Sequence, residues 1–225
     1  MNSDSSRRQM VEQQVRTGDV DDACVLKTMS ALSRDQFVPP MYADLAYADT
    51  EIPLSCGQGM LRPALEGKIL QSLMLDRDDR VLEIGTGSGY LSACLSTHSR
   101  SVTSIDIFDE LVAIAKRNLS RAGIENANLH CMDAFAQLPD GHFDVIVVGG
   151  STPSIVEHFV EALEPRGRMF ALIGEAPIKS ALLITKGNSD EGKQDKDQQD
   201  RHIETLFETE ITELVNAPQN QPFHF

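Results

Sequence analysis

Three alternating glycines follow a short apolar run near the middle of the chain. The run is Val81–Ile84, it includes the acid Glu83, and the glycines are Gly85, Gly87 and Gly89. Such a run is typical of a buried strand in a parallel sheet, and glycines directly after it let the backbone turn sharply and approach a ligand closely. The next residues have a helical pattern, and the first N–H groups of a helix are unpaired donors for an anionic group. These residue types therefore predict a site for a small charged molecule.

The spacing of the glycines excludes two common phosphate-binding motifs. A dinucleotide motif needs a glycine or alanine at the position of Tyr90, or at that of Ser92 if the count starts two residues later. A P-loop needs a Gly-Lys-Ser or Gly-Lys-Thr ending, which this segment lacks. Because Glu83 lies at the end of the strand, it favours a ligand that also carries positive charge. S-adenosylmethionine has an α-carboxylate, an α-ammonium and a sulfonium, so it fits. A glycine turn that binds nothing is the alternative.

Further acids follow the next strand-like runs, where ligands bind in open α/β sheets. Asp106 ends the run 101–106, about 20 residues after Gly85, and a carboxylate there can accept both hydroxyls of a ribose. Asp133 follows the run 127–131 and could accept the exocyclic amine of adenine. Either acid could instead serve only to cap a helix. The expected cofactor-binding residues are Glu83, Gly85, Thr86, Gly87, Ser88, Gly89, Asp106 and Asp133.

Strand-like and helix-like patterns alternate through the middle of the chain. The strand-like runs are 80–84, 101–106, 127–131, 143–149 and 168–173, and the helical patterns are 89–97, 108–121, 154–163 and a short one near 134–138. This alternation predicts an α/β fold with a mostly parallel sheet covered on both faces. The runs 180–186 and 203–212 have no helix between them and predict a terminal antiparallel pair. The polar insert that joins them, 187–201, is expected to be a mobile hairpin loop.

Helical patterns also occupy the first part of the chain. A short amphipathic pattern over 7–17 closes at Gly18, and Asp21 or Asp22 can cap a second helix. Pro63 can open a third helix. The side chains expected on the buried side of that third helix are Leu65, Ile69, Leu70 and Leu73. We expect residues 1–78 to form a cover that packs on a core of residues 79–225, the two together making a single integrated domain.

Composition restricts the classes of function. The chain has 225 residues with a formal net charge of −14, which argues against binding to a nucleic-acid backbone. No apolar run is long enough to span a membrane, and the polar first residues do not resemble a signal peptide, so a cytoplasmic location is expected. The four cysteines are far apart in sequence and the six histidines form no pair with ligand spacing, so no metal site is expected. The oligomeric state is left open, with a monomer as the expectation.

The chain resembles the protein-L-isoaspartate (D-aspartate) O-methyltransferase family over about residues 8 to 175. The likeness rests on the segments 10–16, 37–39, 46–49, 57–58 with Pro63, and most strongly 80–90. It implies the Rossmann-like, seven-stranded class I methyltransferase sheet with an amino-terminal helical cap. It also implies protein repair, in which a methyl group passes from S-adenosylmethionine to the carboxylate of an isoaspartyl residue and leaves S-adenosylhomocysteine.

The chain departs from the family pattern at the implied acceptor site. After Gly-Gln the family usually carries Thr-Ile-Ser, whose hydroxyls face the reacting carboxylate, whereas this chain has Gly59, Met60 and Leu61. Gly59 and Leu61 therefore mark the acceptor site, and a different protein or small-molecule carboxylate is an alternative acceptor. A cofactor-binding protein without catalysis is a further alternative. Glu66 and Lys68 could contact an acceptor, but we expect them to be exposed on the third helix. His130 is expected to be packed rather than catalytic.

Overall fold

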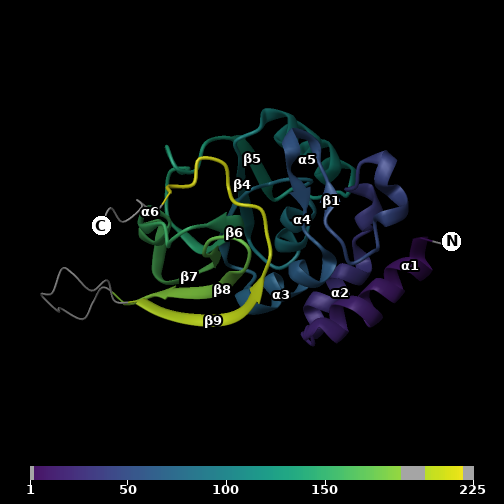
Figure 1. The fold of residues 1–225 in the computed structure, drawn as a ribbon, viewed down its shortest axis with the longest axis horizontal. Helices are drawn as coiled ribbons and strands as arrows, with labels where there is room; N and C mark the ends of the chain where they lie inside the picture. Colours follow the sequence, from purple (N-terminus) through teal and green to yellow (C-terminus); the bar gives the residue numbers. More distant parts are fainter. Residues whose placement is uncertain (1–2, 189–200, 220–225) are drawn as a thin grey trace, which may run out of the picture.

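A seven-stranded sheet runs through the computed structural model, which describes residues 3–188 and 201–219 (Figure 1). The strand order is β5-β4-β3-β6-β7-β8-β9, in which β3 to β7 run parallel and β8 and β9 are antiparallel to their neighbours. The predicted α/β class and the mostly parallel sheet with a terminal antiparallel hairpin are confirmed. The bounds are β3 (Arg80–Ile84), β4 (Ser101–Asp106), β5 (Ala127–Cys131), β6 (Phe143–Thr152), β7 (Leu163–Ile173), β8 (Lys179–Lys186) and β9 (Arg201–Thr209).

The strand order reverses between β3 and β6, and this reversal decides where a ligand can enter. Chain segments leave β3 toward β4 and β5 on one side, whereas β6 leads to β7 on the other. The loops beyond the carboxyl ends of β3 and β6 therefore diverge and leave a crevice, as in other open α/β sheets. Gly85 directly follows β3, and Gly149 lies within the last residues of β6.

Helices cover the two faces of the sheet unequally. α3 (Pro63–Leu73), α4 (Tyr90–Ser96) and α5 (Asp109–Arg121) contribute to one hydrophobic cluster, whereas α6 (Glu157–Glu161) contributes to a second cluster against the other sheet face. Apolar residues recur along α5 at helical spacing, and its acidic first turn and basic last turn complement the helix dipole. The predicted buried side of α3 is confirmed at Leu65, Ile69, Leu70 and Leu73.

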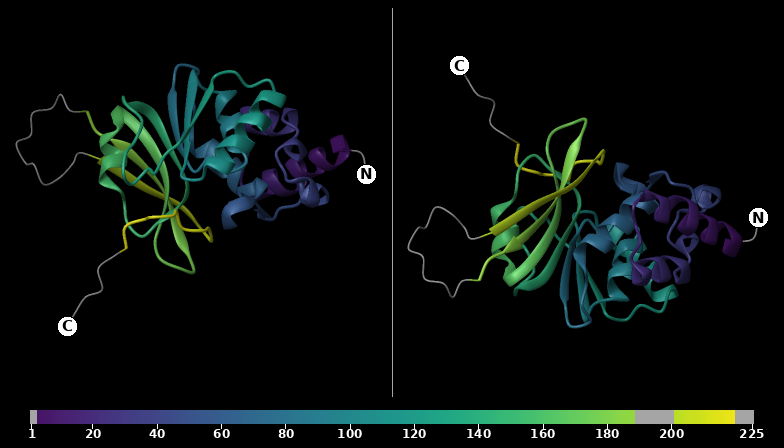
Figure 2. Two further views of the ribbon diagram at one scale, coloured as in Figure 1. Left: turned by 90° about the horizontal axis from the view of Figure 1, so that it is seen from above. Right: turned by 90° about the horizontal axis from the view of Figure 1, so that it is seen from below.

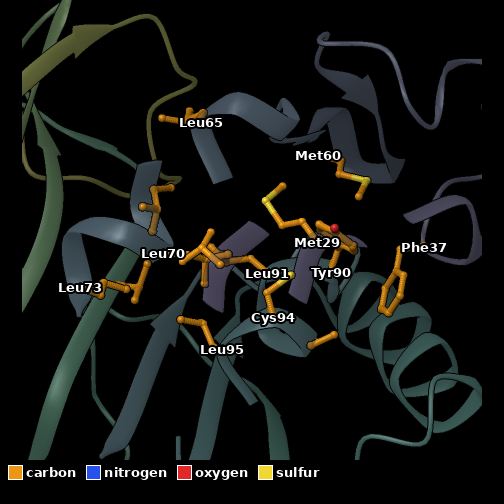
Figure 3. Close-up of a cluster of buried hydrophobic side chains, with 14 of the residues drawn as sticks. Met29, Phe37, Met60, Leu65, Leu70, Leu73, Tyr90, Leu91, Cys94 and Leu95 are labelled. Carbon is orange, nitrogen blue, oxygen red and sulfur yellow. The ribbon is translucent and has the colours of Figure 1, made fainter. Parts of the chain in front are cut away.

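The N-terminal helices join the cluster that contains α3 and α4. α1 (Ser3–Met10) continues as a π-helical turn (Val11–Val15) and a 3₁₀ turn (Arg16–Gly18). Asp22 caps α2 (Ala23–Ala31) by accepting hydrogen bonds from two backbone N–H groups, as one of the two predicted caps. Figure 2 shows these helices and the β8–β9 hairpin at opposite ends of the molecule. Figure 3 shows side chains of α2, α3 and α4 gathered into one cluster, with Phe37 and Met60 at its edge.

A short two-stranded sheet and three 3₁₀ segments connect α2 to α3. β1 (Ile52–Pro53) pairs antiparallel with β2 (Gly59–Met60), so that Pro53 lies opposite Gly59. The 3₁₀ segments are Arg34–Gln36, Pro40–Leu45 and Ser55–Gly57.

Two predicted helices differ from the structure. Residues 134–138 form only a turn, because Pro139 follows closely and cannot continue a helix. The helix predicted over 154–163 is limited to α6, because Leu163 already pairs with Phe143 in the sheet. In the predicted loop 187–201, residues 189–200 lie outside the described residues. Within the described ranges, no helix is both long and apolar enough to cross a membrane.

Candidate active site

The glycine turn between β3 and α4 is held by hydrogen bonds within the turn and to β4. Its three alternating glycines have positive φ angles of 95°, 52° and 84°, which residues with a side chain rarely adopt. The N–H of Gly85 donates to the carbonyl of Ile105 at 2.8 Å. The Thr86 hydroxyl lies 2.6 Å from that of Ser104, and the carbonyl of Ser88 accepts from the Asn118 side chain at 2.9 Å. The side chains of Thr86 and Ser88 are buried, and the hydroxyl of Thr86 and the carbonyl of Ser88 tie the turn to β4 and α5.

Replacing Gly89 by alanine should destabilise the protein more than replacing Gly123 does. Both glycines have positive φ, 84° and 72°, so both variants carry a similar backbone strain. A Cβ on Gly89 would lie 3.0 Å from Cβ and 3.2 Å from Cα of Ala115, whereas one on Gly123 meets nothing within 4 Å. We expect Gly89→Ala to lower the free energy of unfolding by roughly 1–3 kcal/mol more than Gly123→Ala. Urea unfolding measures both, and equal losses would contradict the close approach of α4 and α5.

Asp106 joins the tip of β4 to the glycine turn. One carboxylate oxygen accepts from the N–H of Gly87 at 3.0 Å and the other from the N–H of Phe108 at 3.0 Å. Asp106 is 7% exposed, and burial raises the pKa of its carboxyl above the ordinary value despite these backbone donors. Asp106 also lines two small cavities that both border on Gly85 of the turn, so its carboxylate can still meet a ligand.

Asp133 lies beyond β5 and lines one of these cavities. Its carboxylate accepts from the N–H of Phe135 at 2.9 Å and from the side chain of Asn216 at 2.8 Å. The first bond closes a turn rather than capping a helix. The neighbouring His130 is exposed, so the expectation that it is packed is wrong. It lies on β5, one of the two edge strands of the sheet that the described residues form.

Glu83 lies behind the glycine turn rather than in the cavities. Its side chain is fully buried, one carboxylate oxygen accepts from Ser104 at 2.6 Å and from Ser92, and the other oxygen has no partner among the described residues. Burial raises the pKa of Glu83 to about 7, more than the two serine hydroxyls lower it. Glu83 lines neither cavity, so in this conformation a ligand would meet it only through the intervening turn.

The raised pKa of Glu83 predicts a pH-dependent stability. Because the folded-state pKa of Glu83, about 7, lies well above the ordinary pKa of a glutamate, the stability that this group contributes is full below the ordinary pKa and is lost as the pH rises through the folded-state pKa. Glutamine does not titrate, so the free energy of unfolding of the native chain should fall relative to Glu83→Gln by roughly 2 kcal/mol between about pH 5.5 and 8. Urea unfolding of both proteins across this range tests it, and parallel curves would exclude a titration of Glu83.

The segment after β9 closes the crevice, and sequence patterns did not indicate this. The N–H of Ser151 donates to the carbonyl of Thr212 at 3.0 Å, and the N–H of Leu214 donates to the carbonyl of Ser151 at 2.9 Å. A Cβ on Gly150 would lie 2.8 Å from the Leu214 side chain. Leu214 and Gln58 line both cavities, which are about 50 Å³ each. The apolar residues of 211–215 are the only sequence signal for this segment.

The acceptor-site positions named from the sequence line the cavity that faces β2. Gly59 and Leu61 both belong to its wall, together with Gly85, Gly87 and residues of the segment after β9. The side chain of Met60, which lies between them in the sequence, does not line this cavity. It is 3% exposed and belongs to the buried cluster of Figure 3. Gly59 and Leu61, the positions of the usual Thr and Ser named in the sequence analysis, thus lie beside the glycine turn. Met60 between them packs into the core.

A buried ion pair, which was not predicted, contacts residues 59–61, named here the acceptor loop. Arg34 and Glu66 are 0% and 1% exposed, and their side chains form a salt bridge. Arg34 also donates to the carbonyl of Leu61, and its guanidinium lies 4.8 Å from the centre of the Tyr90 ring. Burial raises the pKa of Glu66 above its ordinary value, although Arg34 lowers it. The expectation that Glu66 is exposed is therefore wrong.

Lys68 also differs from its expected exposure. It is half-buried, its amine lies 4.9 Å from the centre of the Phe207 ring, and it is 3.8 Å from a carboxylate oxygen of Asp19. Lys68 does not line either of the cavities at the glycine turn. The side chain thus links α3 to β9 and to the N-terminal turn.

Comparisons with known proteins agree over most of the chain. Residues 5–208 match the family model described as Protein-L-isoaspartate(D-aspartate) O-methyltransferase (PCMT). A relative from Rhodopseudomonas palustris (strain BisB5), named Protein-L-isoaspartate O-methyltransferase, is 33% identical over 186 residues, 82% of this chain and 85% of the relative. One of the same name from Myxococcus xanthus (strain DK1622) is 37% identical over 165 residues, 73% of this chain and 78% of the relative.

A solved structure shares the fold. It is the crystal structure of a protein-L-isoaspartate O-methyltransferase from Plasmodium falciparum in complex with S-adenosyl-L-homocysteine. The TM-score is 0.77 at 23% identity, and the match covers 92% of this chain and 97% of the other.

Proposed function

Because the chain belongs to the protein-L-isoaspartate (D-aspartate) O-methyltransferase family, we propose that it methylates the isoaspartyl carboxylate of damaged proteins or peptides. S-adenosylmethionine is the methyl donor in this proposal and S-adenosylhomocysteine the product. The observation that supports it best is the joint position of the glycine turn and Asp106, tied by a 3.0 Å hydrogen bond at the reversal of strand order.

The residues around the turn fit S-adenosylmethionine by their chemistry. Asp106 would accept the ribose hydroxyls, and Asp133 would accept the adenine amine. The positive-φ glycines leave backbone groups of the turn close to the cavities. A Cβ on Gly149 would lie 3.1 Å from the carbonyl oxygens of Ile84 and Gly85, so a side chain there would press against the end of β3. A nucleoside needs more room than two cavities of about 50 Å³, so Leu214 and Gln58 would move aside when it binds.

The transfer needs few reactive side chains. The sulfonium of the bound cofactor supplies an activated methyl group. A substrate carboxylate is ionised near pH 7 and attacks without a general base. The protein therefore contributes alignment and exclusion of water, which can lower the barrier by several kcal/mol. Leu61 on one wall and the segment after β9 on the other would exclude water from the reacting groups.

A radiolabel assay tests this function. The protein is incubated with S-adenosylmethionine tritiated at the methyl group and an isoaspartyl peptide, and base-labile label is counted. The expected result is that the isoaspartyl peptide acquires much more base-labile label than a matched aspartyl peptide does. No label, under conditions in which an established repair enzyme works, would reject the activity. Calorimetry with S-adenosylhomocysteine, on the same preparation, shows whether the cofactor site is intact. If this compound does not bind, both methyltransferase candidates are excluded and only a non-catalytic role that does not use this cofactor is left.

A different acceptor is the second candidate, because Gly59 and Leu61 replace the usual hydroxyl residues. This candidate predicts cofactor binding without isoaspartyl methylation. Restoring the hydroxyls with Gly59→Thr and Leu61→Ser then separates the two candidates. A gain of isoaspartyl methylation in the double variant, from an inactive native chain, would assign the altered specificity to this loop.

The remaining functional expectations follow the same reasoning. We propose that the protein acts as a monomer in the cytoplasm, with damaged proteins rather than nucleic acids as partners, since the net charge of −14 opposes binding to phosphates. We also propose that residues 1–78 act as a cover over the catalytic core of residues 79–225. One cluster of buried side chains extends from Met10 to Ile211 and supports treating both parts as one domain.

A further inference from the structure

The side chain of Glu51 lies across Gly59. A Cβ on Gly59 would be 1.9 Å from Oε1, 2.4 Å from Cδ and 2.7 Å from Cγ of Glu51. The pairing of β1 with β2 places Pro53 opposite Gly59. Because side chains two residues apart in an extended strand share a face, Glu51, two residues before Pro53, reaches Gly59 diagonally across this small sheet. The carboxylate of Glu51 therefore occupies the space that a side chain at position 59 would take.

This carboxylate faces the cavity beside the glycine turn. Glu51, Gly59 and Leu61 line the same cavity as Gly85 and Gly87. None of the described residues in its wall is a lysine, arginine or histidine, whereas three are acids: Glu51, Asp106 and Glu213.

Glu51 is the acid of the three that is free to meet an acceptor. Asp106 is held by two backbone N–H groups, and Glu213 accepts from the side chain of Gln219 at 2.6 Å. The side chain of Glu51 has no hydrogen bond or ion pair with any described residue, and it is exposed. An acceptor that enters here would thus meet a negative charge that no described side chain in the cavity wall compensates.

We propose that Glu51 is a specificity-determining residue that selects acceptors with a positive charge beside the methyl-accepting carboxylate. The proposal rests on the proposed function and narrows its substrate class to isoaspartyl sites flanked by lysine, arginine or a free α-amino group. An acceptor carboxylate alone is repelled by Glu51, whereas a neighbouring cation pairs with it. Because Glu51 is exposed, water and salt screen the effect, which is therefore of moderate size and depends on ionic strength.

Peptides that differ in one flanking residue test the selection. Each peptide has one isoaspartate, with lysine, alanine or glutamate on one side, and a second set varies the other side. At low salt the native protein should have a kcat/KM that is about tenfold higher for the lysine peptide than for the glutamate peptide on at least one side. The ratio should fall with added salt.

Two variants assign the preference to Glu51, with a matched control. The ratio in question is kcat/KM for the lysine peptide divided by kcat/KM for the glutamate peptide. Glu51→Gln should lower this ratio at low salt to about the value that the native protein has at high salt. Gly59→Thr should do the same by pushing the flexible end of Glu51 away, and adding it to Glu51→Gln should give no further change. Glu125→Gln makes the same change of net charge at an exposed residue outside the cavity, so its ratio should stay that of the native protein.

The possible results separate this proposal from the function on which it rests. Equal rates for all flanks in the native protein, or an unchanged ratio in Glu51→Gln, would overturn the role of Glu51 and leave the methyltransferase function standing. A loss of the ratio in Glu125→Gln as well would assign it to overall charge and also overturn the role. If no peptide is labelled although S-adenosylhomocysteine binds, the proposed function itself is wrong.

Discussion

Replacing Arg34 by methionine should lower the free energy of unfolding by about 3–5 kcal/mol, because it leaves the carboxyl of Glu66 buried without its partner. Arg34 is 0% exposed, so little water can reach Glu66 in its place. Burial raises the pKa of Glu66 and Arg34 lowers it, so this pKa should rise further without the guanidinium. The variant also loses the donor to the carbonyl of Leu61, so the acceptor loop should loosen.

Two further variants make this prediction specific. Arg34→Met combined with Glu66→Leu removes both charges and should regain most of the lost stability, as apolar replacements of buried ion pairs often do. Arg16→Met breaks the exposed pair of Arg16 and Glu12, whose side chains are 59% and 54% exposed, and should change the stability by less than about 1 kcal/mol. Urea unfolding measures all three. A single variant Arg34→Met as stable as Arg16→Met would mean that the buried pair does not form.

Replacing Asp106 by asparagine should weaken the binding of S-adenosylhomocysteine by at least about a hundredfold. A carboxylate that accepts two ribose hydroxyls makes two charge-assisted hydrogen bonds, and an amide keeps at most one acceptor, so a loss of about 3 kcal/mol is expected. The amide also cannot accept from both Gly87 and Phe108, so the glycine turn loses one of its two ties to β4. Calorimetric titration gives the affinity.

A nearby acid provides the control for Asp106. Asp109→Asn removes a charge in the exposed first turn of α5, three residues further on, and should leave the affinity within about threefold. Urea unfolding of Asp106→Asn without ligand separates a lost contact from a damaged fold. A folded Asp106→Asn that binds within tenfold of the native protein would refute the ribose role of this residue.

The sheet could be predicted from sequence because its strands are nearly continuous apolar runs. β3 and β6 are buried on both faces, and a run such as Val145–Val148 has no other stable environment in a chain of this size. The glycine turn was equally clear, since its spacing restricts the backbone as well as the ligand. Local signals of this kind also limited the cap of α2 to Asp21 or Asp22, of which Asp22 forms it, and located the start of α3 at Pro63.

Pairings between distant residues could not be predicted in the same way. Glu66 was expected on an exposed helix face, because nothing near it in sequence indicates that Arg34 lies buried against it. The contact of Glu51 with Gly59 depends on the register of two very short strands. The placement of Leu214 depends on where the chain goes after β9. In each case the deciding partner is set by tertiary packing, which the periodicity of a single segment does not record.

The position of the segment after β9 offers an optical reporter. The chain contains no tryptophan, so a single indole introduced there would be the sole source of tryptophan fluorescence. Val215 is 39% exposed and lines the cavity on the Asp133 side of the turn. In the proposed function a nucleoside displaces Leu214, the neighbour of this position, which would change the surroundings of the indole. Val215→Trp would therefore report cofactor binding as a change in tryptophan fluorescence that can be followed in real time.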